Sequence, residues 1–330
     1  MCGIAGVYWK NGRPAEQRVV RAMTDTLRHR GPDEDGVFVD GTFGFGMRRL
    51  SIIDLKSGSQ PIGNEDGSVQ VILNGEIYNY RELSETLRRR GHTLLTTSDT
   101  EVIVHLYEDH GTDLVRHLRG MFAFAVWDSR RRLLVLGRDR LGIKPLYYAH
   151  TAEGLVFASE LKAILRASNV AGDIDPGAVA SYLRYGYVPD PLSIFRNVRK
   201  LPAGYLLTFN GEDPPEPQRY WDPVPFFEER PDARPADELV EELRWRLREA
   251  VRSHLVSDVP IGAFLSGGLD SSTVVALMAL EGGQPLKTFS IGFRESDFNE
   301  LPYARVVAER FLKLCSPDAP KTADTAGPGR

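Results

Sequence analysis

Cys2 is the residue whose type and position point most directly to chemistry. The chain opens Met1-Cys2-Gly3, and a small second residue allows the initiator methionine to be removed, which would leave a thiol on the first residue. The α-amino group of such a residue, with a pKa of about 8, can serve as the base for its own thiol, whose pKa is about 8.5. Cys2 is therefore a candidate nucleophile. The alternative is a chance cysteine near a frayed terminus.

A serine- and glycine-rich run later in the chain forms a second candidate site. Ser266-Gly267-Gly268-Leu269-Asp270-Ser271-Ser272 lies between an apolar strand-like run and a predicted helix. Glycines let the backbone approach a ligand, and unpaired amides at a helix start favour an anion, so a phosphate or pyrophosphate is the expected ligand. Asp270 could hold a Mg²⁺ ion that bridges phosphates, and the absence of lysine excludes a Walker loop. The alternative is an ordinary glycine-rich turn capped by serine.

The elements that must position Cys2 belong to one α/β region that extends to about Arg166. Strands are predicted at 69–73, 122–127 and 133–136, where apolar residues are concentrated or alternate with smaller ones. Apolar residues at helical spacing predict two amphipathic helices, one with Val20, Met23 and Leu27 and one with Leu83 and Leu87. Ser98 followed by Glu101 predicts a capping box, which would place Asp99 in the first turn of a further helix.

A proline-rich segment at 211–236 indicates a linker to a second α/β unit. Leu239, Leu243, Leu247 and Val251 recur every four residues and predict a helix before an apolar run at 259–265. A helix at 272–280 and a strand at 289–293 would complete a strand-helix-strand crossover.

Composition indicates a globular protein, because 42% of the residues are hydrophobic and 26% are charged. A formal net charge of -4 gives no support for binding to nucleic acid or to a membrane surface, and no run is long and apolar enough to span a membrane. The cytoplasm is the expected location. Cys2 and Cys315 are the two cysteines, which excludes a disulfide framework and a cysteine zinc cluster. The histidines have no convincing metal spacing and are assigned to the surface or core: His29, His92, His105, His110, His117, His150 and His254.

Five short motifs follow one another in the N-terminal part of the chain. They are Cys2-Gly3-Ile4, Arg30-Gly31-Pro32-Asp33, Arg49-Leu50-Ser51-Ile52-Ile53-Asp54, Asn74-Gly75-Glu76-Ile77-Tyr78-Asn79 and Ser98-Asp99. In this order they resemble the class II glutamine amidotransferases, which are N-terminal-nucleophile glutaminases. The runs 120–124 and 138–147 and the serine-glycine loop resemble glutamine-hydrolysing asparagine synthetases in particular. The resemblance extends over about 2–311.

The resemblance implies a role for each residue around Cys2. Arg49 would pair with the α-carboxylate of glutamine, while Asp99 and Glu76 would receive its α-ammonium group. The Asn74 side chain and the Gly75 backbone amide would stabilise the oxyanion that forms when the thiol attacks the amide carbon. Substitution of Arg49 by alanine would then mainly weaken glutamine binding.

Each of these residues also has an interpretation without function. Arg49 could be a surface cation, Asp99 a charge at a helix start, and Asn74-Gly75 a tight turn between strands. The order of the motifs behind a terminal cysteine favours the glutamine site.

For the second unit the resemblance implies ATP, Mg²⁺ and aspartate as ligands. ATP would bind to Ser266, Gly267, Gly268, Asp270, Ser271 and Ser272, and the backbones of Leu265 and Ile291 would contact adenine. In the family the side-chain carboxylate of aspartate is adenylated, and ammonia from glutamine displaces AMP to give asparagine.

The implied fold is an α/β protein with two parts. An N-terminal-nucleophile αββα sandwich with its C-terminal extension would occupy 2–210, and the linker 211–236 would lead to a partial parallel-sheet ATP-pyrophosphatase domain, adenine nucleotide hydrolase-like, at 237–311. Residues 312–330 are expected to form a divergent, disordered tail, and the second ATP loop and helical region of the family are missing, which favours truncation or a frameshift. Proteolysis is then expected to leave a glutaminase core that ends near residue 210.

Three functions stay open from the sequence. The first is asparagine synthesis with an intact glutaminase half, which the incomplete second half could reduce to an uncoupled glutaminase. The second is a class II amidotransferase that amidates another carboxylate acceptor. The third is a catalytically silent remnant. The acceptor and the oligomeric state, including a homodimer, are not fixed by these residues.

Overall fold

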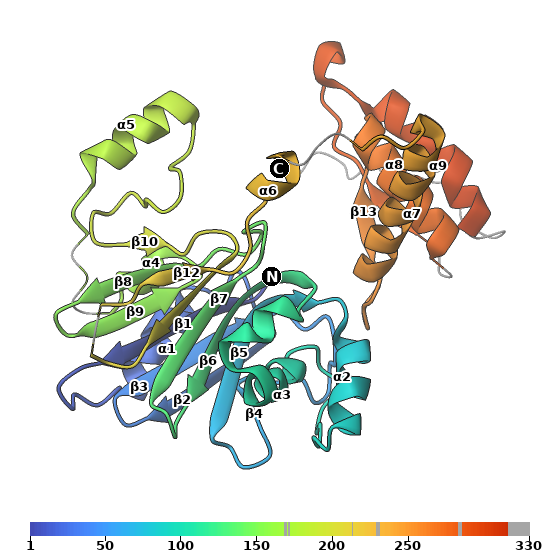
Figure 1. The fold of residues 1–330 in the computed structure, drawn as a ribbon. Coiled ribbons are helices and arrows are strands. Elements are labelled where there is room, and N and C mark those ends of the chain that lie inside the picture. Colours follow the sequence, from blue (N-terminus) through green and yellow to red (C-terminus); the bar gives the residue numbers. More distant parts are fainter. Residues whose placement is uncertain (168–169, 171, 213, 229–231, 283–285, 316–330) are drawn as a thin grey trace. The chain divides into compact units, whose positions relative to one another are not determined.

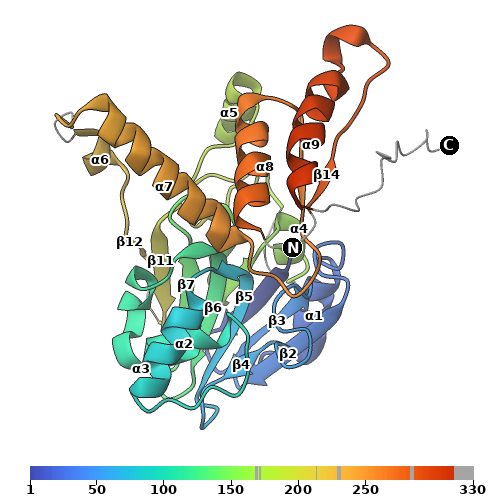
Figure 2. The same cartoon turned by 90° about the vertical axis from the view of Figure 1, so that its right-hand side faces the viewer.

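The computed structural model describes residues 1–167, 170, 172–212, 214–228, 232–282 and 286–315 (Figures 1 and 2). The chain divides into two compact units, of which the first comprises Met1–Glu229 and the second begins at Arg230. Among the described residues, no helix combines the length and the apolar character that crossing a membrane would require.

The first unit contains a six-stranded antiparallel sheet, and one of its inner strands, β1, starts directly after Cys2 (Figure 1). Its strand order is β10-β8-β9-β1-β3-β2, and each neighbouring pair is antiparallel. The strands are β1 (Gly3–Trp9), β2 (Glu34–Asp40), β3 (Phe43–Arg49), β8 (Tyr147–Thr151), β9 (Gly154–Ala158) and β10 (Arg199–Lys200).

A second six-stranded antiparallel sheet has the order β12-β11-β7-β6-β5-β4. The strands are β4 (Ile62–Gly63), β5 (Val69–Ile77), β6 (Gly120–Asp128), β7 (Leu133–Arg138), β11 (Tyr205–Phe209) and β12 (Pro217–Arg219). The three strands predicted at 69–73, 122–127 and 133–136 are confirmed as parts of β5, β6 and β7. The proline-rich segment expected to be a linker contributes β12 to this sheet.

The two sheets pack face to face, and their alternating side chains separate two cores. On β1, Ile4 and Tyr8 point into the core between the sheets, whereas Ala5 and Val7 face a second core under the helices. Phe43 of β3 and Trp127 of β6 stack across the sandwich, with their rings 4.1 Å apart and 9° from parallel. Both faces of the first sheet are therefore covered.

Helices cover the outer faces, which confirms the expected αββα arrangement (Figure 1). The helices α1 (Gln17–Asp25) and α4 (Leu161–Ile164) pack on the first sheet, and α2 (Tyr80–Arg89), α3 (Glu101–His110) and the 3-10 helix η1 (Gly111–Arg116) lie beside the second. The two predicted amphipathic helices correspond to α1 and α2. The remaining helices of this unit are α5 (Pro176–Tyr185) and α6 (Val224–Glu228).

The capping box predicted at the start of α3 is wrong. This helix begins at Glu101, so Asp99 precedes the first turn. The Ser98 hydroxyl oxygen accepts from the N–H of Thr100 at 3.2 Å, and the Glu101 carboxylate accepts from the two N–H groups of 95–96, each at 2.7 Å. These two side chains fix the preceding loop, because Glu101 is buried against it and does not reach back to Ser98.

The second unit contains a parallel strand pair joined by a helix. Its elements are α7 (Ala236–His254), β13 (Gly262–Phe264), α8 (Leu269–Glu281), β14 (Lys287–Phe289), the 3-10 helix η2 (Ser296–Phe298) and α9 (Leu301–Cys315). Leu265, Val275 and Ala304 form its small core. The predicted crossover is confirmed, as is the helix at 236–254.

Two boundaries in the second unit differ from the prediction. The strand predicted at 289–293 ends at Phe289, because the Ser290 hydroxyl donates to the carbonyl of Leu265 at 2.6 Å and the chain leaves the pair there. The tail predicted to be disordered from 312 is helical through Cys315, where helix formers continue without glycine or proline. The rest of the predicted tail, 316–330, lies outside the described residues.

Candidate active site

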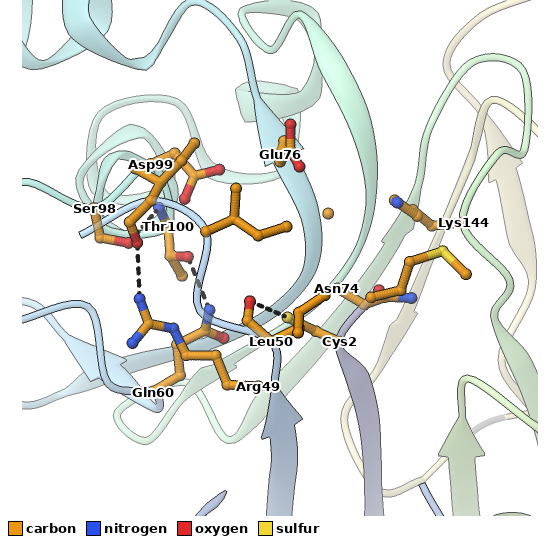
Figure 3. A pocket seen from close by; sticks show the side chains of 14 residues that line it. Cys2, Arg49, Leu50, Gln60, Asn74, Glu76, Ser98, Asp99, Thr100 and Lys144 are labelled. Atoms are coloured by element: carbon orange, nitrogen blue, oxygen red, sulfur yellow. Dashed lines mark hydrogen bonds between the residues drawn. The ribbon is translucent and has the colours of Figure 1, made fainter. Parts of the chain in front are cut away.

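A cavity between the ends of the two sheets brings together the residues that the motifs singled out (Figure 3). Its empty volume is ≈ 480 Å³, part of it open to solvent. The lining includes the six expected residues Cys2, Arg49, Asn74, Gly75, Glu76 and Asp99. Cys2 just before β1 and residues from β3, β5 and the loop before α3 thus meet at one place.

Cys2 is held at the start of β1 by its backbone. The Arg30 Nε donates to the carbonyl of Cys2 at 2.8 Å, and Arg30 is itself fixed by an ion pair with Glu160 at 3.0 Å. The thiol donates to the carbonyl of Leu50 at 3.8 Å. Burial raises the pKa of the Cys2 thiol, so the thiol needs a base before it can act as a nucleophile.

Asn74 and Gly75 lie inside β5, so the interpretation of this pair as a turn is wrong. Asn74 is fully buried, and neither its side-chain oxygen nor its nitrogen has a hydrogen-bond partner within the described part of the chain. A buried amide without partners is costly. Its position in the lining of the cavity indicates that a ligand supplies the missing hydrogen bonds.

The N–H of Gly75 faces the cavity edge of β5. Gly75 is paired with Phe122 of β6, whose own N–H and C=O bond to Asp139 on the opposite side, so Gly75 belongs to a non-hydrogen-bonded pair. The N–H groups two residues on either side bond at the same edge, Leu73 to the Gln60 side chain at 2.7 Å and Ile77 to a carboxylate at 2.9 Å. The Gly75 N–H lies between them.

Only glycine fits at position 75 of this strand. A Cβ there would lie 2.2 Å from the carbonyl oxygen of Met121 and 2.7 Å from the Cα of Phe122. Both contacts are with backbone atoms of β6, which cannot move without opening the sheet. The close approach of β5 and β6 keeps the Gly75 N–H in place.

Two carboxylates form the opposite wall of the cavity (Figure 3). The Asp99 Oδ2 accepts from the N–H of Ile77 at 2.9 Å, and Asp99 is buried. Burial, reinforced by the nearby Glu76 charge, raises the pKa of Asp99 to about 7. An ammonium group bound here would offset the repulsion between the two carboxylates.

Arg49 has a structural role in addition to the predicted one. Its guanidinium donates to Glu34 Oε2 at 2.9 Å and to the carbonyls of Ile53 and Asp54 at 2.8 and 2.7 Å. Two of these three bonds are to the loop that lines the cavity, and the third is to Glu34 of β2. The same cation that would attract a carboxylate also fixes the loop.

We therefore expect Arg49→Ala to lower the free energy of unfolding by about 2–4 kcal/mol as well as to weaken glutamine binding, because buried acceptors lose their donor. The matched control is Arg48→Ala on the same strand. Arg48 pairs with Asp25 and Asp35, which are more exposed than Glu34, the ion-pair partner of Arg49. Loss of the Arg48 side chain should lower the free energy of unfolding by roughly 1 kcal/mol or less. Urea unfolding measures both, and equal losses for the two variants would contradict this role of Arg49.

The cavity also has residues that the sequence did not single out as site residues. They are Met1, Leu50, Ile52, Ile53, Gln60, Ser98, Thr100 and Lys144. Lys144 is buried, and burial lowers the pKa of its ammonium group. The signal for Lys144 was its position within the run 138–147. Gln60 donates to Thr100 at 3.0 Å and accepts from Leu73, a bridge that no local pattern indicates.

The serine-glycine loop of the second unit connects β13 to α8. Gly267 has φ +87°, and a Cβ there would lie 2.5 Å from the backbone nitrogen of Ala304, so the loop requires glycine at this position. The hydroxyl oxygens of Ser266 and Ser271 are 3.0 Å apart, and the buried Ser272 hydroxyl has no partner within the described residues.

Asp270 is exposed in the first turn of α8. One carboxylate among serine hydroxyls is an all-oxygen donor set, which fits a Mg²⁺ ion held mainly by phosphates. The backbone N–H of Leu265 donates to the carbonyl of Phe289 at 2.8 Å, and its C=O accepts from the Ser290 hydroxyl. Both backbone groups of Leu265 therefore have a hydrogen-bond partner at the end of the strand pair. Ile291 follows the neighbouring parallel strand at the same carboxyl edge, where ligands of such sheets bind.

Two family models match the chain. The model of the glutamine amidotransferase domain matches residues 1–221, and the asparagine synthase model matches residues 242–312. Asparagine synthetase [glutamine-hydrolyzing] 1 of Bacillus subtilis is 40% identical over 326 residues, which are 96% of this chain and 51% of that protein. Putative asparagine synthetase [glutamine-hydrolyzing] 2 of Methanocaldococcus jannaschii is 39% identical, covering 94% of this chain and 63% of that protein.

Among solved structures, glutamine phosphoribosylpyrophosphate amidotransferase from B. subtilis, complexed with ADP and GMP, aligns with a TM-score of 0.50 at 18% identity. The alignment covers 90% of this chain and 68% of that chain. This likeness and the αββα layers define the N-terminal-nucleophile class of fold.

The chain belongs to the glutamine amidotransferase family, because the first family model matches more than half of it. The resemblance to this family and to asparagine synthetases is confirmed by the matches. The chain spans about half the length of the curated relatives it matches, 51% and 49% of the first two B. subtilis proteins.

Proposed function

We propose that the first unit hydrolyses glutamine, with Cys2 as the nucleophile. The observation that carries this proposal is the Asn74 amide, buried in the cavity without a partner beside the inward-facing N–H of Gly75. Together they form a pair of donors suited to an oxyanion. Buried donors without a partner are rare in proteins unless they have a function. The Cys2 thiol belongs to the same cavity.

The charges of the cavity select an amino acid with both its backbone groups ionised. The guanidinium of Arg49 would attract the α-carboxylate, and the carboxylates of Asp99 and Glu76 would attract the α-ammonium. The side-chain amide of glutamine would then extend toward Cys2 and the two donors. A substrate that lacks either charge would leave a buried group uncompensated.

The reaction follows from these positions. Once Met1 is removed, the α-amino group of Cys2 takes the thiol proton, and the sulfur attacks the amide carbon of glutamine. The tetrahedral oxyanion is stabilised by Asn74 and Gly75, ammonia leaves with the shuttled proton, and a glutamyl thioester remains. Water then attacks the thioester, which releases glutamate and restores the thiol.

For the second unit we propose that the ammonia acceptor is aspartate, activated by ATP. The support is the match to the asparagine synthase model and the loop from Ser266 to Ser272, whose backbone geometry and hydroxyls suit a phosphate. Mg²⁺ held near Asp270 would neutralise phosphate charge. Ammonia would then displace AMP from the activated carboxylate to form asparagine.

Amino-acid analysis of one reaction tests both steps. Purified chain is incubated with glutamine, aspartate, ATP and Mg²⁺, and glutamate and asparagine are measured in the same sample. Asparagine that accumulates with glutamate supports the whole proposal. Glutamate alone limits the chain to glutaminase activity, and unchanged glutamine with methionine-free protein contradicts it. Replacing aspartate by other carboxylates tests for a different acceptor.

The pKa of Asp99 predicts how glutamine binding depends on pH. Without ligand, burial favours the protonated carboxyl of Asp99. The contribution of this carboxyl to folding stability is full below pH 3.8, its ordinary pKa, and is lost as the pH rises through about 7. A bound ammonium group needs the ionised carboxylate. The dissociation constant of glutamine, measured in a Cys2→Ala chain that cannot turn it over, should therefore fall roughly tenfold from pH 6 to pH 8. The Asp99→Asn chain should bind weakly and show no such change, and a pH-independent constant in the parent would refute the role of Asp99.

A further inference from the structure

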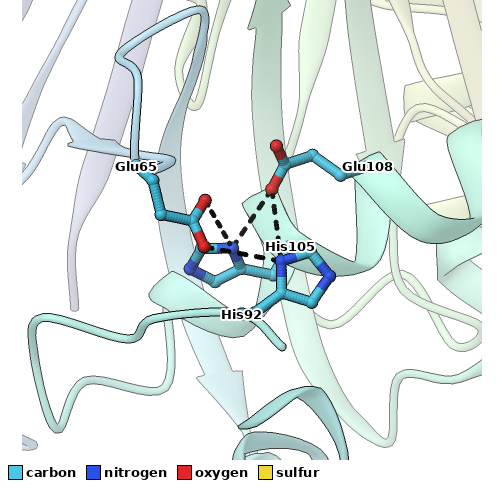
Figure 4. Close-up of side chains that lie close together, drawn as sticks. All are labelled: Glu65, His92, His105 and Glu108. Atoms are coloured by element: carbon cyan, nitrogen blue, oxygen red, sulfur yellow. Dashed lines mark hydrogen bonds and ion pairs between the residues drawn. The ribbon is translucent and has the colours of Figure 1, made fainter. Parts of the chain in front are cut away.

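Four side chains outside the cavity converge beside α3: Glu65, His92, His105 and Glu108 (Figure 4). Glu65 lies in the turn between β4 and β5, His92 follows α2, and the other two lie on α3. From the sequence, both histidines were expected at the surface or in the core, because the histidines have no convincing metal spacing. His105 and Glu108 share one helix face at i,i+3, and tertiary packing brings Glu65 and His92 next to them.

The distances among the four groups fit a tetrahedral metal ion. The His105 Nδ1 lies 3.1 Å from Glu108 Oε2 and 3.5 Å from Glu65 Oε2, and the His92 Nδ1 lies 3.7 and 3.6 Å from the same two carboxylates. Zinc bonds of about 2.1 Å to nitrogen and oxygen in a tetrahedron give a ligand-to-ligand spacing of about 3.4 Å. The four nitrogen-to-oxygen separations lie around this value, with His92 facing Oε1 and His105 facing Oε2 of Glu65, and one ligand atom from each residue gives a set within 4.8 Å of one another.

Three of the four ligands are oriented by a hydrogen bond to a further residue. The His92 Nε2 contacts Asp109 Oδ1 at 3.1 Å, whereas the His105 Nε2 makes no hydrogen bond within the described residues and lies 3.8 Å from Glu101 Oε1. Of the two carboxylates, Glu65 accepts from the N–H of Thr93 at 2.9 Å, and Glu108 accepts from the Asn64 side chain at 2.8 Å. Carboxylates behind ligating histidines are the usual support of metal sites.

The cluster carries a net negative charge. It contains four carboxylates, those of Glu65, Glu101, Glu108 and Asp109, and one guanidinium, that of Arg90, which pairs with Asp109 at 2.9 Å. With neutral imidazoles the sum is -4 + 1 = -3. Such a group is stabilised either by protons on the imidazoles or by a divalent cation.

We propose that Glu65, His92, His105 and Glu108 bind a zinc-type divalent cation in a closed structural site. The two imidazole nitrogens and two carboxylate oxygens suit Zn²⁺, and four protein ligands leave no open position for catalysis. The ion would join the β4–β5 turn, the end of α2 and α3. It would thereby fix the loop between the two histidines, which carries Asp99 of the cavity.

The test measures metal binding directly and does not depend on glutamine hydrolysis. Cys2 and Cys315, the two cysteines of the chain, are replaced by serine so that neither thiol binds the metal. After treatment with a chelator, the full chain is titrated with Zn²⁺ by calorimetry, and Tm is measured with and without the ion. Co²⁺ serves as a spectroscopic probe, because tetrahedral Co²⁺ has intense visible absorption bands.

We expect one Zn²⁺ per chain, tetrahedral Co²⁺ bands and a Tm increase of about 4 °C or more. His92→Gln should weaken binding about 100-fold, and Glu65→Gln, at a turn where the fold tolerates it, at least tenfold or so. His254→Gln on α7 is the control and should bind as the parent does. No stoichiometric binding, or equal affinity in the two ligand variants and the control, would overturn the site and leave an ion-pair cluster.

Discussion

Glutamate release from glutamine is expected to fall by about 10⁴-fold or more when Cys2 is replaced by alanine, on the order seen when a hydrolase loses its nucleophile. The cavity contains no second thiol within its described lining, and the two oxyanion donors cannot act without an attacking group. The fold should be retained, because the carbonyl of Cys2 still accepts from Arg30 and the thiol makes one long bond to Leu50. Release is measured by amino-acid analysis with glutamine alone, and the fold by Tm.

Cys2→Ser is the matched control, because it keeps the size and the backbone of the residue and changes the nucleophilic atom. It should be nearly as inactive as Cys2→Ala, since a hydroxyl is a much weaker nucleophile at neutral pH. Intact mass must show that Met1 has been removed from each chain. Hydrolysis by Cys2→Ala at a tenth of the parent rate or faster would remove Cys2 from the mechanism.

The sequence indicated which residues belong together but not how their atoms are directed. The motif order placed Cys2, Arg49, Asn74 and Asp99 in one site, and the structure brings all four into one cavity. The direction of the Gly75 N–H depends on the register of β5 with β6, which is a non-local property. The bonds of Arg49 to the loop at 53–54 likewise depend on tertiary structure.

Local patterns failed where a buried partner overrides them. Ser98 and Glu101 have the spacing of a capping box, yet Glu101 is buried and bonds to the loop before it. Strands β5, β6 and β7 were predictable because their apolar runs are long and their environment is uniform. The convergence of His92 and His105 was not, because 13 positions of the chain separate them and tertiary packing alone joins them.

Replacing Asn74 by alanine is expected to lower kcat for glutamine hydrolysis by about 10²–10³-fold, the usual loss when one oxyanion donor is removed. KM should change little, because this donor acts on charge that develops in the transition state. The free energy of unfolding should stay within about 1 kcal/mol of the parent. The buried Asn74 amide makes no hydrogen bond to any described residue, so alanine removes no partner and relieves an unsatisfied polar group.

Asn79, five residues further along the same motif, provides the opposite case. Its side chain donates to the carbonyl of His117 and accepts from the N–H of Arg119, both at 2.9 Å, outside the cavity lining. Asn79→Ala should therefore lower the free energy of unfolding by about 1–2 kcal/mol and leave kcat within a few-fold of the parent. Steady-state kinetics and urea unfolding of both variants separate the roles. If Asn74→Ala lost stability and kept its kcat, Asn74 would have a structural role in packing and Gly75 alone would remain as the oxyanion donor.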